Sequence, residues 1–135
     1  MYTRRMIRFR TILLMLVLSL PLSGFAQDVT RPAFADLQQR HAAPLLLDVR
    51  TPAEYGDGHI AGALNVPVDE VAARHGVLGV PRDREVVVYC KSGKRAARAR
   101  DTLQSLGYTN VHLLEGSVDA WRADGRPLVR ERPSP

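Results

Sequence analysis

The stretch Val86-Val87-Val88-Tyr89-Cys90-Lys91-Ser92-Gly93-Lys94-Arg95 decides how this chain is expected to fold. Its three consecutive valines are the strongest strand signal in the sequence, and they predict a strand over Glu85 to Tyr89. Apolar residues then recur at helical spacing, which predicts a helix from about Arg95 to Leu106. The only cysteine, Cys90, therefore falls at the C-terminal end of a strand, in a short basic loop that leads into a helix.

Strand and helix signals alternate on both sides of this stretch. Thr51 and Glu54 flank Pro52 as a capping box, so a short helix is expected to begin there. Six further segments carry such signals: strands over 45–49, 64–66 and 111–114, and helices over 33–40, 69–75 and 118–122. This alternation predicts an α/β fold, with a mostly parallel central sheet of about five strands and helices on both faces.

The first 26 residues have the layout of a secretory signal peptide. Four arginines precede an apolar run from Ile12 to Leu22, and Ser23-Gly24-Phe25-Ala26 supplies small residues for cleavage. The run is short for a membrane span and contains a proline, so cleavage after Ala26 is favoured over a retained membrane anchor. We therefore expect a single periplasmic or secreted domain over 27–135, with its core at about 29–128.

Charge argues against nucleic acid as a partner. The chain carries 19 basic and 14 acidic side chains, a net charge of +5. Four of the basic residues and none of the acidic ones lie in the first 26 positions, so the remainder has a net charge of only +1. Nucleic-acid binding needs a basic face on the folded domain. The four histidines lack ligand spacing, and we expect neither a metal site nor a cofactor: His41, His59, His75 and His112.

The setting of Cys90 predicts a reactive thiol. One cysteine cannot form an internal disulfide, so it is a buried apolar residue, an intermolecular link or a reactive group. A loop that feeds a helix N-terminus can turn several backbone amides inward and form an anion-binding cup. Lys91, Lys94 and Arg95 add positive charge, and cationic neighbours of this kind favour the thiolate form.

Several ordered segments resemble the signatures of rhodanese-like domains. They are Asp48-Val49-Arg50, Glu54-Tyr55, Gly58 to Pro67, Val88-Tyr89-Cys90, Gly107-Tyr108, and Trp121 with Gly125 and Pro127. The resemblance runs from about Val29 to Leu128, and its layout is similar to that of small single-domain exported bacterial rhodaneses. Gly116-Ser117 departs from the two glycines that members often have, with little effect expected on the fold.

The resemblance implies a thiosulfate sulfurtransferase. Cys90 would attack the outer sulfur of thiosulfate or a similar donor and hold it as a persulfide. A thiophilic acceptor, such as cyanide, a thiol or a partner protein, would then remove it. The substrate-binding residues implied are those of the loop, whose amides would stabilise the charged sulfur: Lys91, Ser92, Gly93, Lys94 and Arg95. Lys94 and Arg95 are the two candidates for binding the donor's sulfonate end.

Two alternatives differ from this interpretation. A cysteine phosphatase or arsenate reductase on the same fold needs a loop one residue longer than the four residues between Cys90 and Arg95. A non-catalytic rhodanese-like module would bind partners or carry sulfur without turnover.

Four other residues are expected to be structural. Asp48 and Arg50 can pair and hold the loops together, His59 belongs to a turn, and Trp121 packs in the core.

Overall fold

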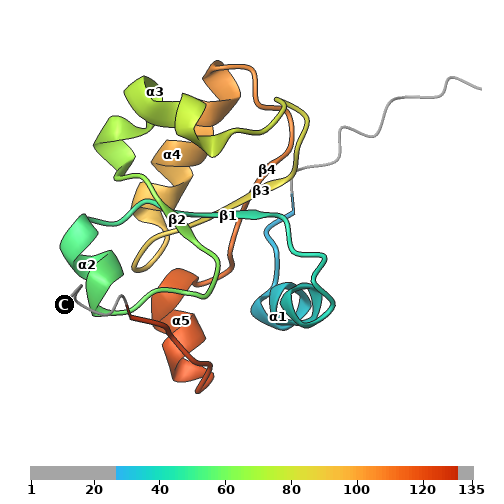
Figure 1. Cartoon of the computed structure of the whole chain (residues 1–135), viewed down its shortest axis with the longest axis vertical. Coiled ribbons are helices and arrows are strands. Elements are labelled where there is room, and N and C mark those ends of the chain that lie inside the picture. Colours follow the sequence, from blue (N-terminus) through green and yellow to red (C-terminus); the bar gives the residue numbers. More distant parts are fainter. Residues whose placement is uncertain (1–26, 131–135) are drawn as a thin grey trace, which may run out of the picture.

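The computed structural model describes residues 27–130 (Figure 1). The predicted signal peptide and its cleavage site precede these residues, so both stay predictions. The helices and strands are, in chain order, α1 (Arg31–Gln39), β1 (Leu45–Asp48), α2 (Pro52–Asp57), β2 (Leu64–Asn65), η1 (Val68–Glu70), α3 (Val71–Arg74), η2 (His75–Leu78), β3 (Val86–Tyr89), α4 (Lys94–Ser105), β4 (Val111–Leu113) and α5 (Ser117–Ala123).

The sheet is parallel throughout, with strand order β2-β1-β3-β4. Leu47 of β1 pairs with Leu64 of β2 on one side and with Val88 of β3 on the other. The α/β prediction is confirmed, although the described residues form four strands where about five were expected. Next to β4, the chain at Val29 makes only a single parallel bridge, to Leu114, and does not extend into a fifth strand.

Alternating side chains place helices on both faces of the sheet. Leu47 and Val88 face the side covered by α3 and α4, whereas Leu46 and Val87 face α1 and α5. Figure 1 shows these two helix layers above and below the sheet, with α2 beyond the end of the strands. Trp121 of α5 lies in the second layer at 3% exposure, so its predicted role in the core is confirmed.

The segment predicted as one helix over 69–75 is three shorter turns. A 3₁₀ turn, η1, leads into the four-residue helix α3, and a second 3₁₀ turn, η2, ends at Gly79. Gly79 has φ +62°, a left-handed conformation that ends the helical path.

A buried ion pair holds the loop that follows β1. Arg50 Nη2 lies 2.6 Å from Asp48 Oδ2 and donates a second bond of 2.9 Å to the Gly58 carbonyl. The Arg50 guanidinium also lies 5.5 Å from the ring centre of Tyr89, whose hydroxyl accepts the Ile60 amide at 3.1 Å. The predicted Asp48–Arg50 pairing is confirmed. Arg50 thus connects the loop after β1 and the turn at Gly58 to the end of β3, which Cys90 follows.

Candidate active site

Cys90 lies immediately after β3, at the carboxyl edge of the sheet, where open α/β folds place ligands. It is 1% exposed and packs in the core layer beneath α4. The Gly93 amide donates to the Cys90 sulfur at 3.1 Å. Gly93 precedes α4 with φ +126°, a conformation that side chains disfavour, so a glycine here lets the loop fold back over the sulfur.

The start of α5 binds the backbone around Cys90. The Val118 amide donates to the Cys90 carbonyl at 3.1 Å, and the Asp119 amide donates to the Lys91 carbonyl at 3.0 Å. The Cys90 amide in turn donates to the Ser117 hydroxyl at 3.2 Å. Ser117 was noted in the sequence only as a small residue in place of a glycine. Its contact with the candidate nucleophile was missed, because no local pattern links positions 27 residues apart.

Arg95 is held by a carboxylate from α2. Its two terminal nitrogens donate to Glu54 at 2.8 and 2.9 Å, a bidentate pair. Glu54 also accepts the Thr51 amide at 3.0 Å, which completes the predicted capping box. Hydrogen bonding to Arg95 is the main cause that lowers the pKa of Glu54 to about 2, and the same contact raises the pKa of Arg95. The capping role of Glu54 was predicted, but its partnership with Arg95 was not.

Within the described residues, the other predicted loop residues make no hydrogen bond to the Cys90 sulfur. Lys91 reaches Asp119 of α5 at 2.8 Å on the exposed surface. Ser92 and Lys94 are exposed, and Lys94 makes no ion pair with any residue in 27–130. Of the two candidates for the sulfonate end, Arg95 is therefore occupied by Glu54, and Lys94 keeps an uncompensated charge.

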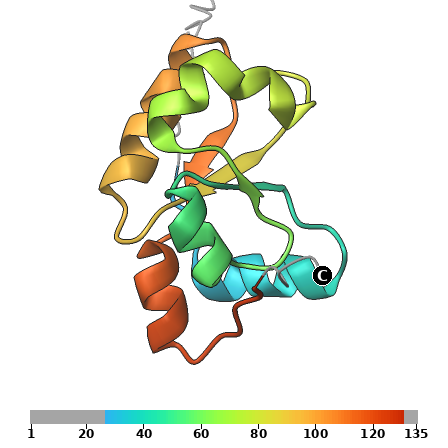
Figure 2. The ribbon, with the colours of Figure 1, turned by 60° about the vertical axis from the view of Figure 1, so that its left-hand side comes forward.

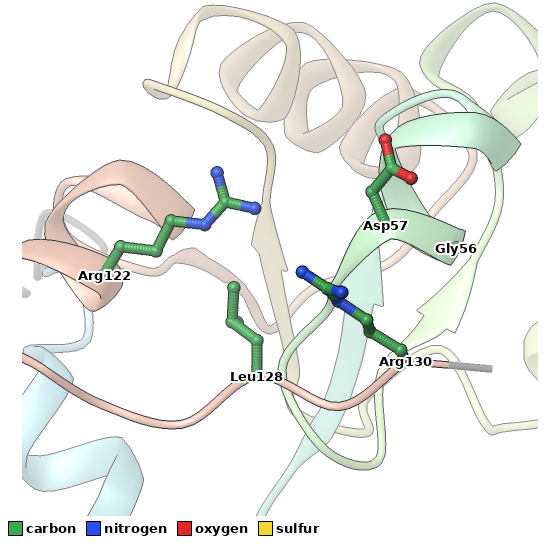
Figure 3. Close-up of a pocket in the computed structure, with 5 residues that line it drawn as sticks. All are labelled: Gly56, Asp57, Arg122, Leu128 and Arg130. Carbon is green, nitrogen blue, oxygen red and sulfur yellow. The ribbon is translucent and has the colours of Figure 1, made fainter. Parts of the chain in front are cut away.

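Two adjoining pockets lie between α2 and α5, and the smaller one reaches the loop at Lys91. Figure 2 shows this loop, between β3 and α4, next to α2 and the start of α5. The smaller pocket, of about 150 Å³, is lined by Arg50, Glu54, Asp57, Lys91, Val118 and Arg122. The larger, of about 610 Å³, shares Asp57 and Arg122 with it. Its other lining residues are Gly56, Leu128 and Arg130 (Figure 3).

Residues 27–130 contain neither a cluster of metal-ligating side chains nor a helix that could span a membrane. In that part of the chain, no three histidine, cysteine or acidic side chains gather closely enough to hold a metal ion. Its helices are also too short or too polar for any of them to cross a membrane.

The described residues form a parallel α/β sheet with a single cysteine between the end of β3 and the start of α4. A rhodanese-like domain model matches residues 32–124, and the chain belongs to that family. The family predicted from the sequence is therefore confirmed, and the chain is related to sulfurtransferases.

Named relatives agree with this assignment. A sulfurtransferase of Allochromatium vinosum is 42% identical over 85 residues, which cover 63% of this chain and 78% of that protein. The thiosulfate sulfurtransferase PspE of Escherichia coli is 36% identical over 78 residues, which cover 58% of this chain and 75% of the relative. The solved structure of the human single-domain sulfurtransferase TSTD1 superposes with a TM-score of 0.64 at 29% identity, covering 74% of this chain and 97% of that one.

Proposed function

We propose that the chain is a thiosulfate sulfurtransferase in which Cys90 carries the transferred sulfur. The observation that supports this most directly is the Gly93 amide, which donates to the Cys90 sulfur at the entrance to α4. An amide aimed at a sulfur stabilises negative charge on it, and the N-terminus of a 12-residue helix adds positive potential at the same point.

The reaction has two steps. The Cys90 thiolate attacks the outer sulfur of thiosulfate, the sulfur–sulfur bond of the donor breaks, and sulfite leaves with the bonding electrons. Cys90 then holds a persulfide whose terminal sulfur is negatively charged. A thiophilic acceptor, cyanide or a thiolate, bonds to that terminal sulfur, and the Cys90 thiolate is released. The electrons balance without any other oxidant or reductant.

The loop charges support Lys94, rather than Arg95, as the residue that would bind the donor's sulfonate end. Arg95 is already bound by Glu54, whereas Lys94 is exposed and makes no ion pair in 27–130. Exposed amides of the loop would supply further hydrogen bonds to the sulfonate oxygens. The same occupied arginine disfavours a phosphatase, which needs a free arginine to clamp a tetrahedral oxyanion.

Intact-mass spectrometry with and without thiosulfate tests the proposal. The wild-type protein is expected to gain the mass of one sulfur atom, and cyanide is expected to remove it as thiocyanate. Cys90→Ser is expected to gain nothing and to form no thiocyanate. A Cys90→Ser protein that still turned over thiosulfate would overturn the assignment. A wild-type persulfide that neither cyanide nor small thiols discharge would favour a carrier that passes sulfur to a partner protein.

A further inference from the structure

The larger of the two pockets between α2 and α5 has two arginines on its lining. Figure 3 shows the Arg122 and Arg130 side chains entering it from two separate segments, with the Leu128 side chain between them. Arg122 lies in α5, whereas Arg130 lies in the segment that follows this helix. The Asp57 carboxylate, at the end of α2, is the acidic group on the lining.

Arg122 and Arg130 differ from most other arginines in the part of the chain that the structure describes. Within residues 27–130 neither makes an ion pair, and Asp57 makes none either. Most arginines in that part of the chain are paired with carboxylates: Arg31, Arg40, Arg50, Arg74, Arg95, Arg98, Arg100 and Arg126. Within the described residues, two guanidinium groups without an acidic partner and a single carboxylate line this pocket, so it has an excess of positive charge and of hydrogen-bond donors.

The pocket is connected to the loop through shared residues. Asp57 and Arg122 line both the larger pocket and the smaller one, and the smaller one reaches Lys91, the residue after Cys90. A molecule lying along both pockets would therefore have one end at the arginines and the other beside the loop. A volume of about 610 Å³ is in the range of pockets for small organic molecules, well above what thiosulfate or cyanide needs.

We propose that Arg122 and Arg130 form a binding site for the carboxylate of a thiol acceptor, which receives the persulfide sulfur from Cys90. This proposal rests on the proposed function. Guanidinium groups bind carboxylates through paired charge-assisted hydrogen bonds, and Leu128 offers an apolar contact for the molecule's carbon chain. The acceptor class that fits is a small carboxylate-bearing thiol, such as a peptide thiol, with its sulfur at the loop and its carboxylate at the arginines.

The test isolates discharge of the persulfide from its formation. The persulfide form is prepared with thiosulfate, freed of excess donor, and mixed with glutathione or with 2-mercaptoethanol, a thiol without a carboxylate. Arg122→Gln and Arg130→Gln are each expected to lower the glutathione rate, relative to the 2-mercaptoethanol rate, by about 3- to 10-fold. Asp57→Asn is expected to raise the same ratio, because it removes a negative charge from the pocket.

Arg84→Gln is the matched control. Arg84 is also exposed but precedes β3, at the opposite end of the strand from Cys90, so the ratio should not change. The wild-type ratio should fall toward the variant ratios as ionic strength rises. A ratio that none of the pocket variants changes would overturn the proposal while leaving the sulfurtransferase intact. A wild-type protein that forms no persulfide would instead refute the proposed function.

Discussion

The Glu54 carboxylate caps α2 and also binds Arg95, and the second contact makes stability depend on pH. Its pKa of about 2 lies below the ordinary 4.5, so the ionised pair stabilises the fold above about pH 4.5, and this contribution is lost as pH falls toward 2. We expect Glu54→Gln to lower the free energy of unfolding by about 1 kcal/mol at pH 7, because the pair is partly solvent-exposed.

Urea unfolding of the wild type and Glu54→Gln at several pH values measures this difference. It should shrink steadily below pH 4.5, since glutamine retains the capping geometry but cannot titrate. A difference that stayed constant down to pH 2 would show that the lost stability does not come from the ionised carboxylate.

Ser117 offers a second residue-scale prediction. Its hydroxyl accepts the buried Cys90 amide, and its φ of +53° is unusual for a residue with a side chain. Ser117→Ala removes the acceptor and keeps the backbone strain, so we expect a loss of about 1–2 kcal/mol in thermal or urea unfolding. Ser117→Gly removes the same acceptor but relieves the strain, and should cost less. Equal losses in the two variants would show that the positive φ at position 117 does not reduce stability measurably.

The elements around the site depend on the ion pair at the end of β1. Asp48 and Arg50 are both nearly inaccessible to solvent, so removing the acid leaves a buried, unpaired guanidinium. Asp48→Ala should therefore lower the free energy of unfolding by about 3–5 kcal/mol in urea denaturation. Asp36→Ala is the control, because its pair with Arg40 is exposed on α1 and should contribute less than about 1 kcal/mol. Similar losses in both would show that burial does not determine the effect.

On the scale of the whole molecule, export remains a prediction from the first 26 residues. Expression of the full chain in a Gram-negative host should yield a periplasmic protein whose measured mass is that of a chain beginning at Gln27. Replacing the apolar run from Ile12 to Leu22 with polar residues should leave the uncleaved chain in the cytoplasm. Recovery of the unprocessed wild type in the membrane fraction would instead indicate that the segment is retained as an anchor.

Local patterns carried much of the fold. The valines of β3 and the helical spacing after Arg95 predicted the bounds of their elements to within one position. The capping box at Thr51 predicted where α2 begins. The turns over 68–78 were less predictable, because a short segment between tertiary contacts can divide among α and 3₁₀ geometry with little change in local sequence preference. A fifth strand would need several bridges between the chain at Val29 and the chain after β4, whereas Val29 makes one bridge, to Leu114.

Sequence patterns were enough to predict a parallel α/β domain of the rhodanese-like family with one cysteine at a strand end. Strand propensity, helix capping and hydrophobic spacing are properties of neighbouring residues, so they can be recognised in the sequence. Three arrangements became visible only in the folded molecule: Glu54 binds Arg95, Ser117 accepts the Cys90 amide, and Arg122 and Arg130 share a pocket. The contacts of Glu54 and Ser117 join residues 41 and 27 positions apart, and all three arrangements depend on how the helices pack against the sheet.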